Sequence, residues 1–172
     1  MTQDTSAKPT LKRFEGRTRA RIQGTQLKEL KKLPDDRGWL MELMRADWPE
    51  FKKFGQVYIT CVYPGIAKAW HYHEKQRDAF VGIVGMSKVV LWDGREDSPT
   101  YGAVNEFFTG VERPLLITIP PFVMHGFTAV GTEPAVILNT CSELYNYAEP
   151  DEFRAPYNDP GIPYDWLAPK HG

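Results

Sequence analysis

Short runs of β-branched and aromatic residues, separated by turns rich in glycine and proline, constrain the fold of this chain most strongly. No segment shows a sustained period of 3.6 residues, so an amphipathic helix is not expected. The expected strands are residues 25–33, 39–44, 56–63, 67–73, 79–84, 87–92, 104–109, 115–119, 126–130 and 135–140. Short strands at spacings of about eight to twelve residues predict an all-β sandwich or barrel.

The chain length predicts one domain with tails at both ends. A chain of 172 residues is long enough for one sizeable core. Residues 1–24 lack periodicity and are expected to form an irregular N-terminal arm. Residues 146–172 are acidic and rich in proline, but they contain several aromatic side chains. Because aromatic side chains favour burial, we expect this tail to pack on a domain formed by residues 25–145.

The composition excludes several classes of partner. The chain is 42% hydrophobic and 25% charged, with a net charge of −1, which gives no reason to expect nucleic acid or a charged membrane surface as a partner. Neither an apolar run of membrane-spanning length nor a secretory leader is evident. Cys61 and Cys141 show no metal-type or redox-type spacing, so we expect buried, reduced thiols in a cytoplasmic protein.

The stretch 65–85, GIAKAWHYHEKQRDAFVGIVG, concentrates the candidate functional residues. In a strand, His71 and His73 point to the same face, and Asp78 can rejoin that face after a bend. His125 lies in a later strand-like segment, IPPFVMHGF. Three imidazoles and one carboxylate facing one cavity would hold a divalent metal such as Zn, Mn, Fe or Ni. They would equally supply a general base and an oxyanion donor, and both alternatives stay open.

The spacing of this stretch resembles the first signature of the cupin superfamily, with Asp78 where that signature usually has glutamate. Pro120 and His125 keep the spacing of the second signature, while Phe122 and Ala129 replace its usual glycine and asparagine. The resemblance implies a double-stranded β-helix, or jelly roll, in agreement with the strand pattern.

A more specific resemblance rests on seven stretches in order: residues 35–42, 56–57, 71–72, 93–102, 119–121, 125–127 and 164–166. The run 93–102, DGREDSPTYG, is the longest of them. Together they resemble the dTDP-4-dehydrorhamnose 3,5-epimerase family over residues 25–166. The resemblance implies a homodimer that shares a strand. It also implies a nucleotide-linked 4-keto-deoxysugar substrate and a role in polysaccharide or deoxysugar biosynthesis.

The resemblance also implies roles for individual residues. His71 matches the catalytic base, His125 matches a second histidine near the sugar, and Tyr145 matches an active-site tyrosine. Positions near the nucleotide or sugar are Arg37, Glu42, Gln56, Lys68 and Asn139.

Several catalytic partners of the family are replaced in this chain. Asp78 stands where the family has an enolate-stabilising lysine, Asn139 where it has a tyrosine acid, and Lys68 where it has a phosphate-binding arginine. The aspartate that pairs with the catalytic histidine has no counterpart after Trp166. A metal held by His71, His73, Asp78 and His125 would restore the lost positive charge.

Other arrangements of these groups remain open. Asp78 could pair with Arg77 or Lys75, or accept a hydrogen bond from His71, and none of these options needs a metal. If His71 bound a metal, the base would be Glu74, Tyr145 or a metal-bound hydroxide.

Three functions therefore compete. The first is an isomerase that epimerises a nucleotide-linked keto sugar through an enolate. The second is a metal-dependent cupin enzyme of another class. The third is a nucleotide-sugar-binding protein without catalysis.

Overall fold

The computed structural model describes residues 20–167, which form twelve β-strands and no helix. Within this range no helix exists that could cross a membrane. The all-β prediction is confirmed. The strands are β1 (Gln26–Glu29), β2 (Leu33–Asp35), β3 (Gly38–Leu40), β4 (Gln56–Val62), β5 (Ala67–Tyr72), β6 (Asp78–Val84), β7 (Met86–Trp92), β8 (Val104–Gly110), β9 (Leu115–Ile119), β10 (Met124–Ala129), β11 (Ala135–Cys141) and β12 (Phe153–Arg154).

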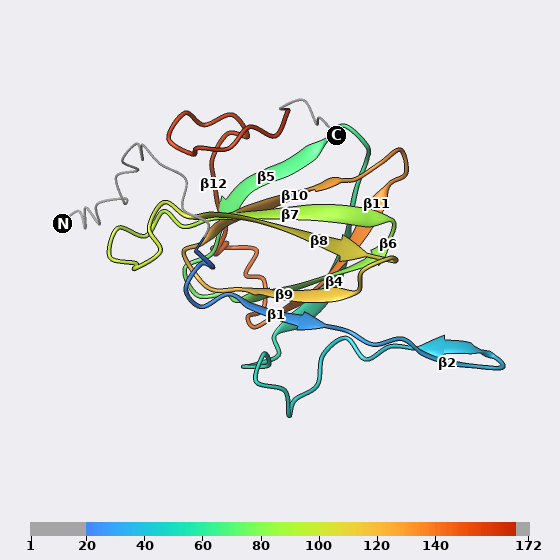
Figure 1. Ribbon diagram of the computed structural model, residues 1–172. Helices are drawn as coiled ribbons and strands as arrows, with labels where there is room; N and C mark the ends of the chain where they lie inside the picture. Colours follow the sequence, from blue (N-terminus) through green and yellow to red (C-terminus); the bar gives the residue numbers. More distant parts are fainter. Residues whose placement is uncertain (1–19, 168–172) are drawn as a thin grey trace.

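Two five-stranded antiparallel sheets lie face to face (Figure 1). The first has the order β1-β9-β6-β11-β4, and the second has the order β12-β5-β10-β7-β8. The core between them contains side chains from both sheets, among them Phe80, Leu91, Ile117, Phe127 and Ile137. Strands distant in sequence therefore meet across one interior, as in the jelly roll that the sequence predicted.

Additional segments cover the outer faces of both sheets. Met41, Leu43 and Trp48 pack on the outer face of the first sheet. The C-terminal tail covers the second sheet, where the ring centroid of Trp166 lies 4.9 Å from that of Trp70. Strand β12 of this tail pairs with β5 (Figure 1). The sequence did not predict this two-residue strand, because its pairing depends on a partner far away in the chain.

The segment around residues 33–44 differs from the strand pattern expected for it. The predicted strand 25–33 is divided, so that β1 joins the first sheet and β2 forms a separate hairpin with β3. The predicted strand 39–44 ends at Leu40, and the residues that follow cover the first sheet instead. The hairpin extends away from the two sheets (Figure 1). Its tip coincides with the turn predicted at residues 34–38.

The N-terminal arm lies mostly outside the described residues. Near the N-terminal end of the described residues, Ile22 is buried in the core. Its backbone N–H donates a 2.9 Å hydrogen bond to Asn105 Oδ1. Both cysteines are free thiols, but only Cys141 is buried. The expectation of a buried thiol is wrong for Cys61, because alternation along β4 turns Cys61 outward and its neighbour Val62 inward.

Candidate functional site

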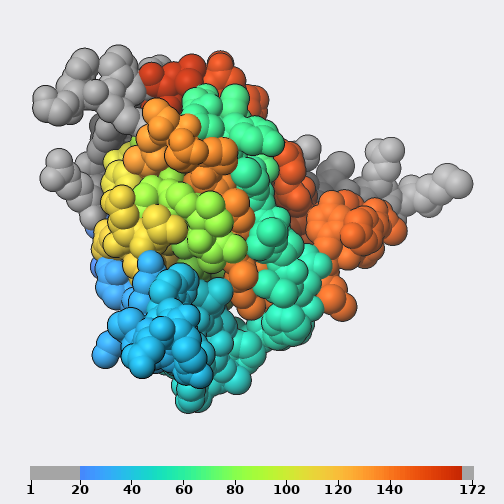
Figure 2. Space-filling model, turned by 90° about the vertical axis from the view of Figure 1, so that its right-hand side faces the viewer, coloured from blue at the N-terminus to red at the C-terminus, as the bar shows by residue number. Residues whose placement is uncertain are grey.

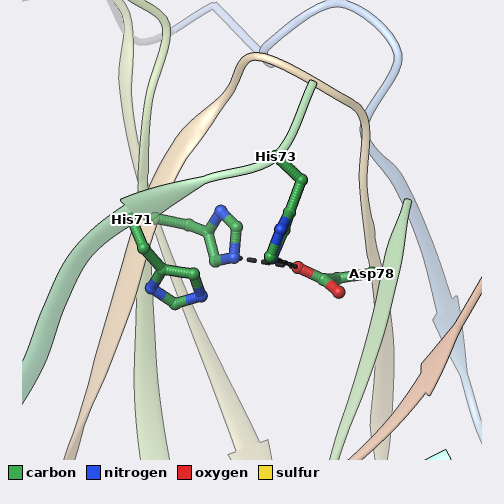
Figure 3. A group of neighbouring side chains, drawn as sticks. His71, His73 and Asp78 are labelled. Carbon is green, nitrogen blue, oxygen red and sulfur yellow. Dashed lines mark ion pairs between the residues drawn. The ribbon is translucent and has the colours of Figure 1, made fainter. Parts of the chain in front are cut away.

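Three adjacent or facing strands bring the predicted histidines and aspartate together. His71 lies on β5, directly opposite His125 on β10, while His73 follows β5 and Asp78 begins β6. One ligand-type atom from each of the four side chains lies within 4.8 Å of the others. Figure 3 shows His71, His73 and Asp78 converging between the sheets. The predicted shared face is therefore present, because Trp70 and Met124, the neighbours of His71 and His125, point to the outer core instead.

Asp78 lies at the centre of the cluster and is 1% exposed. Its Oδ2 atom lies 3.0 Å from His125 Nε2 and 3.3 Å from His73 Nε2. Burial alone would raise the pKa of Asp78, but contact with His125 and His73 holds that pKa well below its usual value. Asp78 thus contacts two histidines, in place of the pairing with Arg77, Lys75 or His71 considered from the sequence.

Backbone carbonyls fix the orientation of two imidazole rings. The Nδ1 atom of His125 lies 2.9 Å from the Val123 carbonyl oxygen, and that of His73 contacts the Asp151 carbonyl oxygen. Each Nδ1 must therefore carry a hydrogen and donate it, because a carbonyl oxygen only accepts. This leaves the Nε2 atom of both rings directed at Asp78.

The third ring, that of His71, differs from the other two in its contacts. Its centroid lies 4.0 Å from that of His125, yet no side chain or carbonyl among residues 20–167 hydrogen-bonds to it. Burial, followed by the nearby His125, lowers the pKa of His71 well below its usual value. His71 is therefore a neutral imidazole with a free nitrogen, which is the form required of a proton acceptor.

Amide groups hold the second oxygen of Asp78. Asn139 Nδ2 donates to Asp78 Oδ1 at 2.9 Å and to the Tyr58 hydroxyl at 3.0 Å, while its Oδ1 accepts from Ala79 N at 2.9 Å. Gln76 Nε2 also donates to Asp78 Oδ1, at 2.7 Å. The predicted site residue Asn139 is thus a fully hydrogen-bonded amide that connects Asp78 to a tyrosine.

Tyr58 is the site residue that sequence analysis missed. Burial, and then the negative charge of Asp78, raise the pKa of Tyr58, so its hydroxyl keeps its proton at neutral pH. A signal for this residue was present, because Gln56 and Tyr58 are two residues apart on β4 and share a face.

The remaining predicted residues are spread around and beyond the cluster. Tyr145 is 39% exposed, and its backbone N–H donates to Gln56 Oε1 at 3.3 Å. Lys68 is exposed on β5 and donates to Thr60 Oγ1 at 2.9 Å. Arg37, at the hairpin tip, forms an ion pair with Asp35, and Glu42 forms one with Arg45. Neither Arg37 nor Glu42 contacts the histidine cluster within one chain.

The longest family-like motif, residues 93–102, has a structural role in this chain. The Asp93 carboxylate accepts hydrogen bonds from Arg95 Nε at 2.7 Å and from the Ser98 and Thr100 hydroxyls at 2.6 Å each. Asp93 is fully buried, so these bonds replace the water that the carboxylate loses on folding.

Comparison with known proteins supports the family assignment. Residues 33–153 match the family described as polysaccharide biosynthesis C-terminal domain. The chain is 41% identical to the spore coat polysaccharide biosynthesis protein SpsL of Bacillus subtilis, over 84% of this chain and 96% of that protein. It is 42% identical to the probable low-salt glycan biosynthesis epimerase Agl13 of Haloferax volcanii, over 88% of this chain and 98% of that protein.

A solved structure is also similar. The crystal structure of a dTDP sugar isomerase from Desulfovibrio desulfuricans G20 superposes with a TM-score of 0.81 at 36% identity, over 87% of this chain and 94% of that one. The predicted resemblance to cupin-fold sugar epimerases is therefore confirmed. This chain belongs to the polysaccharide biosynthesis C-terminal domain family and is an isomerase-class sugar epimerase.

Proposed function

We propose that this protein epimerises a carbon next to the keto group of a nucleotide-linked 4-keto-deoxysugar, with His71 as the base. The observation that carries the proposal is the state of His71, a neutral imidazole without a hydrogen-bond partner among residues 20–167, at the edge of a buried polar cluster. The relatives named as epimerase and dTDP sugar isomerase support this substrate class.

The proposed reaction uses two protein groups on the sugar carbon. His71 takes the proton from the carbon beside the ketone, and the electron pair of that C–H bond moves onto the keto oxygen to form an enolate. Tyr58 then returns a proton from its hydroxyl to the opposite face of the same carbon, which inverts the configuration. Asn139 supports this role, because it donates to the Tyr58 oxygen and leaves the hydroxyl hydrogen available.

Exchange of the sugar proton with solvent tests this function. The protein is incubated in heavy water with a dTDP-4-keto-6-deoxyhexose, and deuterium at the carbons beside the ketone is followed by NMR. We expect wild-type exchange and at least a hundredfold slower exchange for His71→Gln, in line with the loss of a general base. Glu133→Gln is the control, because Glu133 is exposed. Tight binding of the nucleotide sugar without any exchange would identify a binding protein instead.

The proposal includes a cytoplasmic homodimer that shares its β4 edges. Strand β4 ends the first sheet, and its outward side chains Val57 and Ile59 are 52% and 65% exposed. Trp39 and Leu40 of the hairpin are also exposed, and Figure 2 shows the hairpin segment and the β4 region on one face of the molecule. Burial of such a surface favours association, and it would let the hairpin carrying Arg37 reach the substrate of the second subunit. The free cysteines support the cytoplasm as the compartment.

Light scattering after size exclusion tests the dimer. We expect twice the mass of one chain for the wild type and the mass of one chain for Ile59→Lys. Thr132→Lys, at an exposed turn, is the matched control and should remain dimeric. A dimeric Ile59→Lys variant, or a monomeric wild type, would contradict a shared β4 edge.

A further inference from the structure

The cluster around Asp78 brings two imidazole nitrogens and one carboxylate oxygen close together. His73 and His125 both direct Nδ1 at backbone carbonyls, so Nε2 is the ring nitrogen that each presents to Asp78. Gln76 Nε2 lies 3.3 Å from His73 Nε2 and 2.7 Å from Asp78 Oδ1, which indicates that His73 Nε2 accepts a hydrogen bond. The two Nε2 atoms nevertheless face the same carboxylate oxygen, Asp78 Oδ2.

Two of these atoms are also buried and unsatisfied. Asp78 Oδ2 and His125 Nε2 lack a hydrogen-bond partner, although His125 is only 1% exposed. A buried polar atom without a partner costs about 1 to 3 kcal/mol in a folded protein, so its persistence calls for a group that satisfies it. No lysine or arginine of residues 20–167 forms an ion pair with Asp78.

The distances between these atoms agree with those between ligands of one metal ion. With metal–ligand bonds of about 2.1 Å, two ligands at angles of about 90° to 109° lie about 3.0 to 3.4 Å apart. The separations from Asp78 Oδ2 are 3.0 Å to His125 and 3.3 Å to His73. Two imidazoles and one carboxylate on one side of an ion form a ligand set common among divalent transition metals.

We propose that His73 Nε2, His125 Nε2 and Asp78 Oδ2 bind one divalent transition-metal cation, while His71 stays outside the ligand set. His71 makes no ion pair with Asp78, and its ring contacts His125 instead. This assignment deepens the proposed function, since it leaves His71 free as the base. A cation bound at these atoms supplies positive charge that can polarise a keto oxygen.

The remaining contacts of the three ligands agree with a metal site. Metal-binding histidines usually donate their second ring nitrogen to a carbonyl or carboxylate, which fixes the ring. Val123 and Asp151 provide such carbonyls for His125 and His73. Gln76 and Asn139 hold the other oxygen of Asp78, so that Oδ2 remains directed at the two rings.

Metal analysis of protein purified without a histidine tag tests the assignment without any substrate. Zn, Mn, Fe and Ni are quantified by mass spectrometry, and Mn²⁺ binding to dialysed protein is followed by electron paramagnetic resonance. We expect about one cation per chain in the wild type and in His71→Gln. His125→Gln and Asp78→Asn should each bind less than about 0.1 cation per chain. Mn²⁺ should also raise the melting temperature of the wild type and of His71→Gln only.

His73→Gln provides a second ligand variant if Asp78→Asn does not fold. A folded His73→Gln or His125→Gln variant that keeps stoichiometric metal would overturn the assignment. Equal loss of metal in His71→Gln would also overturn it, because His71 would then be a ligand. A folded, metal-free wild type that binds no Mn²⁺ would show that protons join Asp78 to its histidines. Deuterium exchange by such metal-free protein would leave the proposed epimerisation standing while removing the metal.

Discussion

The backbone carbonyl of Asp151 contacts Nδ1 of His73, while the carboxylate of Asp151 accepts hydrogen bonds from three successive backbone N–H groups of residues 74–76, each at 3.0 Å. One residue of the C-terminal tail therefore fixes both the ring of His73 and the loop between β5 and β6. The same hydrogen bonds keep the pKa of Asp151 below its usual value, against the opposing effect of burial.

We predict that Asp151→Asn slows turnover and lowers the free energy of unfolding by about 1 to 2 kcal/mol, because an amide has one acceptor oxygen where the carboxylate has two. Urea unfolding and the rate of deuterium exchange measure the two effects. Glu149→Gln, an exposed change in the same tail, is the control. Unchanged turnover in a destabilised Asp151→Asn variant would show that the carboxylate bonds to the loop of residues 74–76 have no role in the reaction.

The sequence indicated Tyr145 as the active-site tyrosine, whereas the structure indicates Tyr58. We predict that Tyr58→Phe reduces epimerisation by about a hundredfold, because it removes the hydroxyl held by Asn139. Tyr145→Phe should cost less than about tenfold, since Tyr145 contacts Gln56 through its backbone N–H and not through its hydroxyl. Exchange of the sugar proton should persist in Tyr58→Phe while inversion is lost. The reverse order of effects would assign the acid to Tyr145.

The loop 93–102 makes stability depend on pH. The folded-state pKa of Asp93 lies below its usual value: burial raises it, but hydrogen bonds from Arg95, Ser98 and Thr100 outweigh burial. A carboxylate of this kind stabilises the fold above its unfolded pKa of about 3.9, and the stabilisation is lost as pH falls through the folded pKa.

We therefore predict that Asp93→Asn costs about 2 to 3 kcal/mol at pH 7. The difference from the wild type should shrink as pH falls below about 4. Denaturant unfolding at several pH values measures it, with the exposed Asp97→Asn as the control. A constant difference at every pH would contradict the role given to the ionised carboxylate.

The C-terminal tail contributes to the outer core over the second sheet. Trp166 is 6% exposed and packs on Trp70, which is 1% exposed. We predict that Trp166→Ala lowers the free energy of unfolding by about 3 kcal/mol, because it opens a cavity beside Trp70. Leu167→Ala, at a side chain that is 67% exposed, should change stability by less than about 0.5 kcal/mol. Equal effects of the two substitutions in chemical denaturation would mean that the tail does not pack in solution.

The sequence alone determined the fold class and the residues of the cluster. Alternating strands separated by turns leave few alternatives to a β-sandwich, and alternation also places His71 and His73 on one face. These properties depend on residues close together in the chain, so local physical rules are sufficient. The family resemblance added the expected fold, a jelly roll, and the class of enzyme.

Tertiary structure decided which groups the cluster uses and how. Asp78 contacts His73 and His125 instead of His71, and Asp151 and Tyr58 join the site from the tail and from β4. The pairing of β5 with β10 and β12, and of β11 with β4 and β6, brings these residues together, and strand pairing across long stretches of chain leaves no local sequence pattern. The chemistry of His73 and His125 follows from burial and from the carbonyls that hold them, and that of His71 follows from burial without such a partner; these surroundings exist only in the folded protein.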